Sequence, residues 1–389
     1  MIKSNDFQMN HITEIRFGSG ISDSIGNEVK KYGSKVLVIS DVGLRGLGIV
    51  ETITGSLERA KLDHILYDDV LPNPRDSACH EAANKGRDSD VDVVVAVGGG
   101  SAMDTAKAVS VLMSNGGTCT KWAEIRKFEK SLVPVICVPT TSGTGSEVTF
   151  EAVINSTELG RKVSISDGNK MAPKLAIMDP KLTLSVPPLV TASTGMDALT
   201  HAIEAYTCLY SQPISDGLAL YAMKKISASI IEATQDGNNL KAREDMMVGS
   251  LMAGMAFTNS FLGAVHAFSE RLGGFYDIPH GIANAIFLPF VTEYNVSANY
   301  GKHAVVAECL GVETYGLNDI EASKAGVRKL FELNRILGIP KFKDLEKVSS
   351  EDFDELSELC MTHPCGAKAN PRKIETEDYK RILKKAYAY

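Results

Sequence analysis

The chain has 389 residues, of which 44% are hydrophobic and 23% are charged, and its formal net charge is −7. This is the composition of an ordinary globular protein that is long enough for two domains. The acidic balance argues against a nucleic acid as partner. No apolar run reaches the roughly 18 residues of a membrane-spanning helix, and the polar start MIKSNDFQMN does not read as a signal peptide. We therefore expect a cytoplasmic protein without a membrane partner.

The first half of the chain alternates apolar segments with helix-forming segments. Four apolar runs predict buried strands, at residues 36–39, 91–97, 133–138 and 175–178. Strands that alternate with helices are typical of a parallel sheet. After Pro187 and Pro188, segments rich in Ala, Met and Leu predict helices nearly to the end of the chain. We therefore predict an α/β domain over residues 1–185 and an all-helical domain over residues 186–389.

Asp41 follows the first predicted strand. An acidic side chain at this position can accept hydrogen bonds from ribose hydroxyl groups and would repel the 2′-phosphate of NADP. The alternative is that Asp41 caps the following turn, which is a frequent role for aspartate. The first interpretation favours NAD(H) over NADP(H) as the cofactor.

A glycine-rich turn follows the second predicted strand and opens the helix-forming stretch AMDTAKAVSVLM. Its residues are Gly98, Gly99, Gly100 and Ser101. Backbone N–H groups and the helix dipole converge on an anion at such a turn, so it suits a pyrophosphate. The spacing GGGS is not GxGxxG, and the turn by itself is weak evidence. The loop PTTSGTGSEVT, residues 139–149, adds hydroxyl and N–H groups suited to a nucleotide, with a linker of small residues as the alternative.

Two potential metal ligands lie four residues apart in GMDALTHAIEAY. Asp197 and His201 leave the same face of a predicted helix about one turn apart, so both can bind one ion.

A second pair of potential ligands is His266 and His280. We expect Gly273 and Gly274 to break the segment between them and Pro279 to precede a helix that starts at His280. Three imidazoles and one carboxylate suit Fe²⁺, Zn²⁺, Mn²⁺, Co²⁺ or Ni²⁺ better than Ca²⁺. Each histidine could instead cap a helix or form a hydrogen bond by itself, but the set as a whole predicts a metal site. Such an ion would polarise an alcohol or aldehyde oxygen while a nicotinamide carries the hydride.

Five segments resemble the iron-containing (group III) alcohol dehydrogenase family, which includes lactaldehyde reductase and propanediol dehydrogenase. They are GGGSAMDTAKA, PTTSGTGSEVT, TGMDALTHAIEAY, HAFSERLGGFYDIPHG and NAIFLP. The similarity extends from about Phe17 to the C-terminal helices. It implies a dehydroquinate synthase-like architecture: an α/β domain that binds NAD(P), a helical domain that holds the metal, with Fe²⁺ first among the candidates, and a catalytic cleft between them.

The resemblance also implies roles for individual residues. The family's four metal ligands correspond to Asp197, His201, His266 and His280. Asn73, in LPNPR, corresponds to an asparagine near the nicotinamide and the substrate. The positions that correspond to the surroundings of the dinucleotide are Gly98, Gly99, Gly100, Ser101, Asp104, Thr140, Thr141, Ser146, Thr149 and Lys162.

Glu270 departs from the family pattern. Many relatives carry a histidine at this position, close to the nicotinamide, where it is thought to pass protons. Glu270 could act as a base itself, contact a cationic or polyhydroxylated substrate, or form a structural pair with Arg271 or another cation.

The sequence thus predicts a metal-dependent NAD(H) oxidoreductase that interconverts a short primary alcohol or diol and its aldehyde. One alternative is a lyase of the dehydroquinate synthase type, although its ligand set of two histidines and one glutamate differs from the set here. Another is a metal-binding or substrate-binding protein without redox activity. We also expect a homodimer or a larger homo-oligomer, with a small alcohol or aldehyde as substrate.

Overall fold

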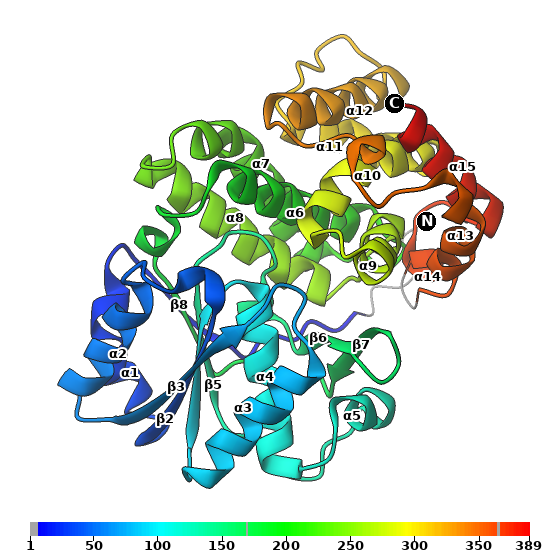
Figure 1. The fold of residues 1–389 in the computed structure, drawn as a ribbon. Helices are drawn as coiled ribbons and strands as arrows, with labels where there is room; N and C mark the ends of the chain where they lie inside the picture. Colours follow the sequence, from blue (N-terminus) through cyan, green and yellow to red (C-terminus); the bar gives the residue numbers. More distant parts are fainter. Residues whose placement is uncertain (1–6, 169, 364–365) are drawn as a thin grey trace. The chain divides into compact units, whose positions relative to one another are not determined.

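The computed structural model describes residues 7–168, 170–363 and 366–389. The chain divides into two compact units, shown in Figure 1. His11–Val186 form one unit, and Pro187–Tyr389 form the other together with the described residues that precede His11. Residues 7–10, which we had placed in the first domain, join the helical unit because the N–H of Asn10 donates a hydrogen bond of 2.7 Å to Asn259 Oδ1. The domain boundary at residue 185 stays a prediction.

The α/β unit is built on a six-stranded parallel sheet. Its strand order is β1-β8-β5-β4-β2-β3. The strands are β1 (Glu14–Phe17), β2 (Lys35–Asp41), β3 (Asp63–Val70), β4 (Val93–Gly98), β5 (Val135–Pro139) and β8 (Leu175–Met178). The parallel sheet and four of its strands were predicted. β1 and β3 were missed because β1 is short and mostly exposed and β3 carries several charged residues.

Residues along each central strand alternate between two apolar cores, one on each face of the sheet. Leu37 and Ile39 face one core, and Val36 and Val38 face the other. The helices of this unit are α1 (Ile25–Val29), α2 (Ile49–Arg59), α3 (Asp76–Asp88), α4 (Gly100–Asn115) and α5 (Cys119–Ile125). α1 and α2 cover the face of Val36, whereas α3 and α4 cover the face of Leu37. Burial on both faces explains why β2 and β4 are almost continuously apolar.

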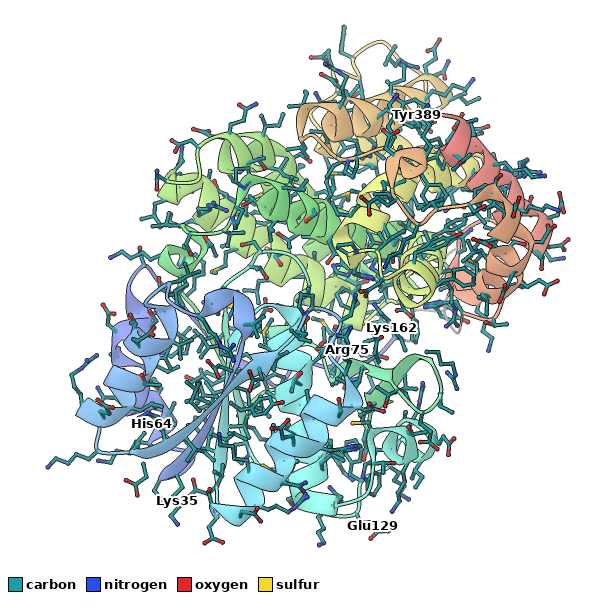
Figure 2. The ribbon with its side chains drawn as sticks, in the orientation of Figure 1. Lys35, His64, Arg75, Glu129, Lys162 and Tyr389 are labelled. Carbon is teal, nitrogen blue, oxygen red and sulfur yellow. The ribbon has the colours of Figure 1, made fainter. Side chains whose placement is uncertain are left out.

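The order of the strands reverses at β2. The chain passes from β2 to β3 on one side and then returns to β4 on the other side of β2. Ligands of open α/β sheets bind at such a switch point, beyond the carboxyl ends of the strands. Figure 2 shows Lys35 and His64, at the amino ends of β2 and β3, at the edge of this unit opposite Arg75 and Lys162.

An antiparallel hairpin, which the sequence analysis did not predict, follows the sheet strand β5. It consists of β6 (Glu151–Ser156) and β7 (Arg161–Ser166), paired in register from Glu151 with Ser166 to Ser156 with Arg161. Ala152, Ile154 and Ile165 of the hairpin belong to the same core as α3, α4 and α5. The α/β unit therefore contains a two-stranded sheet beside the parallel one.

The secondary structure of the second unit is helical in its described residues, as predicted. Its helices are α6 (Pro188–Thr207), α7 (Pro213–Gln235), α8 (Leu240–Thr258), α9 (Ala264–Tyr276), α10 (His280–Asn295), α11 (Tyr300–Cys309), α12 (Asp319–Ile336), α13 (Phe353–Met361), α14 (Gly366–Ala369) and α15 (Thr376–Ala388). They share one apolar core. In the part of the chain that the structure describes, none of the helices combines the length and the apolar character needed to cross a membrane.

Close packing fixes α10 against α6. A Cβ atom at Gly281 would lie 2.5 Å from the backbone oxygen of Ser193, so a glycine is needed for the two helices to approach this closely. Because His280 starts α10, this contact sets its position relative to α6. The expected break at Gly273 and Gly274 is wrong, since both lie inside α9. The helix ends instead at Asp277, whose φ of 58° is left-handed.

Candidate functional site

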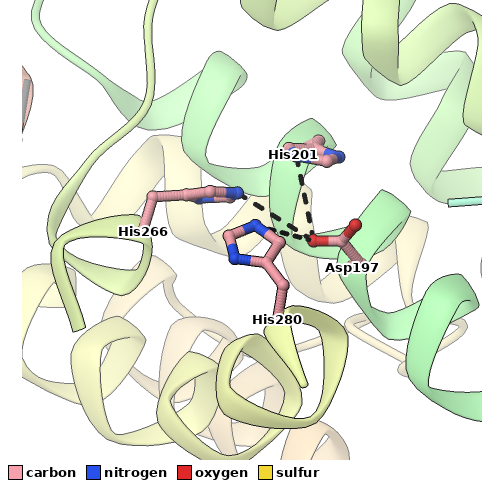
Figure 3. A group of neighbouring side chains, drawn as sticks. All are labelled: Asp197, His201, His266 and His280. Carbon is pink, nitrogen blue, oxygen red and sulfur yellow. Dashed lines mark ion pairs between the residues drawn. The ribbon is translucent and has the colours of Figure 1, made fainter. Parts of the chain in front are cut away.

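Four potential metal ligands from three helices meet in the helical unit, as Figure 3 shows. Asp197 and His201 lie one turn apart in α6, whereas His266 comes from the first turn of α9 and His280 from the start of α10. The Nε2 atoms of His201, His266 and His280 lie 3.8, 4.0 and 3.7 Å from Asp197 Oδ1. The structure thus brings together the four residues that the sequence analysis proposed as ligands.

The spacing and the chemistry of these four side chains fit one first-row divalent ion. One ligand atom from each residue lies within 4.8 Å of all the others. An ion with bonds of about 2.0–2.2 Å to nitrogen and oxygen brings its ligand atoms to roughly 3–4 Å from one another. Asp197, His201 and His266 are buried, whereas the His280 side chain is 29% exposed. The cluster therefore has its accessible side at His280.

Charge is concentrated in this buried cluster. Burial disfavours the charged form of Asp197, but the charges of His201, His280 and His266 outweigh burial and lower the pKa of Asp197. Burial also disfavours a charged His266, but its hydrogen bond to Glu204 and the nearby carboxylate charges outweigh this and raise the pKa of His266. The cluster therefore attracts a cation, and protons compete with a metal for His266.

Glu204, which was not predicted from the sequence, orients His266. Its Oε2 lies 2.6 Å from His266 Nδ1, and its Oε1 accepts a hydrogen bond of 2.7 Å from the N–H of Val265. A carboxylate at Nδ1 favours the tautomer in which Nε2 carries a lone pair, and this is the nitrogen that faces Asp197. The available signal was its position three residues after His201, on the same face of α6.

Asn284 links three members of the cluster and was also missed. Its Nδ2 donates a hydrogen bond of 2.6 Å to Asp197 Oδ1 and lies 3.2 Å from the Nε2 atoms of both His266 and His280. Asn284 follows His280 by four residues in α10, so helical spacing pointed to it. Because Asn284 is fully buried, its amide restrains where the Asp197 oxygen and the two rings lie.

Glu270 pairs with a histidine and not with the neighbouring arginine. Its Oε2 lies 2.9 Å from Nε2 of His363. Arg271 instead donates a hydrogen bond of 3.1 Å to the backbone oxygen of Leu359. Glu270 therefore pairs with a side chain other than Arg271, as one of the alternatives for Glu270 expected. Its role toward a substrate stays a proposal.

The glycine-rich turn lies at the switch point of the parallel sheet. Gly98 ends β4 with a φ of 150°, and a Cβ atom there would lie 2.6 Å from Asp41 Oδ2. Only glycine fits between these strand ends. The N–H of Thr140 donates a hydrogen bond of 3.1 Å to the Gly98 oxygen, and a Cβ atom at Gly99 would lie 3.3 Å from Thr141 Oγ1. The predicted turn and the start of the loop 139–149 are therefore adjacent.

Asp41 caps a turn at the end of β2. Its Oδ1 accepts a hydrogen bond of 3.0 Å from the N–H of Gly43. Burial raises the pKa of Asp41, although hydrogen bonds from backbone groups, Gly99 first, oppose this. Gly100 and Ser101 form the beginning of α4, beyond the same turn. Asp41 therefore caps the turn, as the second interpretation expected. Its contact with a ribose stays a proposal.

A buried lysine organises the loop that follows β5. Lys107 Nζ donates hydrogen bonds of 2.8 Å to both Ser146 Oγ and Thr149 Oγ1, and one of 2.9 Å to the backbone oxygen of Glu151. Asp104 accepts a hydrogen bond of 2.6 Å from Ser146 Oγ and lies 3.7 Å from Lys107 Nζ. Three residues that the resemblance placed around a dinucleotide thus fix this loop to α4, and their contact with a cofactor stays a proposal.

The remaining predicted site residues lie elsewhere in the α/β unit. Asn73 precedes α3 with a φ of 54°, and Arg75 donates a hydrogen bond of 3.2 Å to its backbone oxygen. Lys162 lies in β7 opposite Asn155. A positive φ at a residue other than glycine is uncommon and often occurs at functional sites. The conformation of Asn73 therefore agrees with its predicted place in a site.

Comparisons with known proteins cover almost the whole chain. The family model described as iron-containing alcohol dehydrogenase matches residues 13–180, and the model described as Fe-containing alcohol dehydrogenase family, C-terminal, matches residues 191–387. A 1,3-propanediol dehydrogenase of Citrobacter freundii is 38% identical over 375 residues, which cover 95% of this chain and 96% of that protein.

Two further proteins extend the comparison. An NAD-dependent methanol dehydrogenase of Bacillus methanolicus is 36% identical over 370 residues, which cover 95% of this chain and 97% of that protein. A crystal structure of a 1,3-propanediol oxidoreductase matches with a TM-score of 0.95 at 36% identity, and covers 98% of this chain and 100% of that one.

Replacing Glu204 with Gln should weaken the binding of a divalent ion by about tenfold or more, because the charged acceptor that sets the His266 tautomer is lost. Competition with a chelator of known affinity measures this change. Glu293→Gln is the matched control, since Glu293 is exposed and pairs with Lys385. Equal metal affinity in Glu204→Gln and the unmodified protein would contradict the role of Glu204.

Burial raises the pKa of Glu147 to about 7 from an ordinary value of 4.5. The folded protein therefore holds this proton more tightly than the unfolded chain, and stability is lost as the pH rises from about 4.5 to 7. The loss is about 3 kcal/mol at most. Glu147→Gln should show a growing gain in unfolding free energy over this interval and a constant gain above it, as measured by denaturant unfolding. The exposed control Glu124→Gln should show no such trend; a pH-independent difference for Glu147→Gln would contradict the assignment.

Proposed function

We propose, from the premise that this chain belongs to the iron-containing alcohol dehydrogenase family, that it interconverts a short primary alcohol or diol and its aldehyde with NAD(H). The chain is an oxidoreductase of the alcohol dehydrogenase type, and the family implies a divalent metal and NAD binding. The observation that carries the proposal is the buried cluster of one aspartate and three histidines.

The proposed metal ligands are Asp197, His201, His266 and His280, with Fe²⁺ as the first candidate. Three neutral imidazoles and one carboxylate leave a bound divalent ion with net positive charge. When bound, the ion acts as a Lewis acid on the substrate oxygen and the nicotinamide accepts or donates the hydride. Glu204 holds His266 in place, and the exposed side of His280 gives a substrate access to the cluster.

The proposed dinucleotide site is the switch point between β2 and β4. Gly98 to Ser101 offer backbone N–H groups and the start of α4 to a pyrophosphate. The partly buried carboxylate of Asp41 beside this turn supports a preference for NAD over NADP. A relative described as NAD-dependent, the methanol dehydrogenase, agrees with this preference. The other proposed cofactor contacts are Asn73, Asp104, Thr140, Thr141, Ser146, Thr149 and Lys162.

The names of the relatives support a short substrate. Propanediol and methanol are the substrates in the names of two relatives that span nearly all of this chain. We include in the proposal a cytoplasmic location and a homo-oligomeric state. The lyase alternative loses its support, because these relatives are named as dehydrogenases and both family models describe alcohol dehydrogenases. The same comparisons disfavour a binding protein without redox activity.

His266→Ala should remove most of the bound metal and reduce NADH formation from a short alcohol by at least a hundredfold, because one of four ligands is lost. Metal content per chain and NADH absorbance measure the two effects. His303→Ala is the matched control, since His303 is equally buried but lies in α11, outside the cluster. Full metal content and turnover in His266→Ala would contradict the proposed ligand set.

Asp41→Asn should raise the ratio of kcat/KM with NADP to that with NAD by roughly five- to tenfold, because one negative charge near a 2′-phosphate is removed. The amide oxygen can still accept the hydrogen bond from Gly43. Initial rates with each cofactor at fixed alcohol concentration give the ratio. Asp68→Asn, at a partly exposed carboxylate that pairs with Arg45, is the control. If Asp41→Asn is active and its ratio of kcat/KM with NADP to that with NAD is unchanged, Asp41 does not select the cofactor and only caps the turn.

A further inference from the structure

A carboxylate on the helix that carries His266 pairs with an imidazole from another segment of the chain. Glu270 Oε2 lies 2.9 Å from Nε2 of His363, which follows α13. The His363 side chain is only 5% exposed, whereas that of Glu270 is 25% exposed. The imidazole is therefore held inside the protein, and the carboxylate stands at the border between the interior and the solvent.

The hydrogen bonds of His363 fix its tautomer. The N–H of Gly366 donates a hydrogen bond of 2.9 Å to His363 Nδ1. Because Nδ1 is the acceptor, the ring proton lies on Nε2, which donates to Glu270 Oε2. In this tautomer the imidazole carries no charge, so it does not compensate the negative charge of Glu270. Gly366 is itself fixed against α9, since a Cβ atom there would lie 2.5 Å from the Cβ of Ala267.

Glu270 is placed beside the proposed metal ligands. It follows His266 by four residues, so the two side chains lie about 40° apart around α9 and about one turn, roughly 5–6 Å, along it. Around the axis of α9, Ala267 lies beyond Glu270 as seen from His266. Because Gly366 contacts Ala267 and hydrogen-bonds to His363, His363 lies on the Ala267 side of Glu270. The charge of Glu270 contributes to the raised pKa of His266, which agrees with this proximity.

We propose that Glu270, positioned by His363, determines substrate specificity by accepting a hydrogen bond from a hydroxyl group on the far carbon of the substrate. The inference rests on the proposed function and names the substrate class. The spacing of His266 and Glu270 along α9 is one helical turn. Two or three carbon–carbon bonds of about 1.5 Å and one hydrogen bond span a similar length. A substrate whose oxygen reaches the metal cluster therefore presents its second or third carbon to Glu270, as in a short diol or hydroxyaldehyde.

Charge distinguishes this class from similar molecules. A hydroxyl group at the far carbon donates a hydrogen bond to the carboxylate, whereas a methyl group desolvates the carboxylate and returns no hydrogen bond. A carboxylate or sulfonate on the same carbon is repelled by Glu270. The pair should therefore favour diols over simple alcohols and reject anionic substrates, and His363 acts as a positioning residue for the carboxylate.

Three substrates with the same three-carbon chain test the inference: 1,3-propanediol, 1-propanol and 3-hydroxypropanoate. The metal-loaded protein should oxidise the diol at least about tenfold more efficiently, by kcat/KM, than 1-propanol, the range expected for a hydrogen bond to a charged group. It should oxidise 3-hydroxypropanoate least well. Glu270→Leu should abolish the preference for the diol, and Glu270→Gln should reduce this preference and raise kcat/KM for 3-hydroxypropanoate relative to 1-propanol.

Substitutions of His363 separate positioning from general structure. His363→Gln retains an amide N–H that can reach Glu270 and should keep the preference for the diol. His363→Leu should raise KM for 1,3-propanediol several-fold with little change in kcat, and leave the kinetics with 1-propanol unchanged. A purely structural role would lower turnover of all three substrates by the same factor in His363→Leu.

The outcomes distinguish the inference from the proposed function. Equal substrate ratios in the unmodified protein and Glu270→Gln, with both active, would overturn the role of Glu270 and leave the dehydrogenase activity standing. Absence of NAD-linked turnover of any alcohol by the metal-loaded protein would overturn the proposed function and the inference with it. If Glu270→Leu does not fold, as judged by thermal unfolding, the isosteric Glu270→Gln decides through the same two ratios.

Discussion

The burial of one carboxylate, that of Asp197, is the constraint on which the site depends. Asp197 is 2% exposed, and an ionised carboxylate moved from water into a protein interior costs several kcal/mol unless it is compensated. Three imidazoles and the amide of Asn284 surround it. A divalent ion among the same ligands would compensate the charge more fully. The helices α6, α9 and α10 must therefore meet at this point for the unit to tolerate Asp197.

The residues behind the cluster turn this requirement into a defined geometry. Glu204 sets the tautomer of His266, and the close approach of Gly281 to Ser193 sets the start of α10. In the α/β unit a comparable constraint acts at Gly98, where only glycine fits beside the Asp41 carboxylate. In each unit, a close approach of glycine backbone thus fixes the chain at the proposed site. Contacts with neighbouring side chains position the polar groups there, whether or not a ligand is bound.

The sequence predicted the features that depend on local patterns. Apolar runs predicted the buried strands β2, β4, β5 and β8, and helical spacing predicted the pairing of Asp197 with His201. The strand β3 and the hairpin β6–β7 were missed because polar residues interrupt their apolar pattern. Gly273 and Gly274 were expected to break a helix, but tertiary packing outweighs the weak helix propensity of glycine there.

Contacts between distant segments could not be predicted from local patterns. Nothing in the spacing links Lys107 to Ser146 and Thr149, or Glu270 to His363, which is 93 positions further along the chain. The Lys107 contacts assign a structural role to residues that the family resemblance connects with a cofactor. The contact of Glu270 with His363 joins α9 to a segment that no local spacing connects with it.

The most direct test of the central claim is an anaerobic titration of chelator-treated protein with Fe²⁺, in which bound metal per chain and NADH formation from 1,3-propanediol are recorded on the same samples. Both should rise together and reach their plateau at about one ion per chain, as expected for a single four-ligand site. Full turnover in the metal-free protein, or saturation of metal binding without any NADH formation, would contradict this claim.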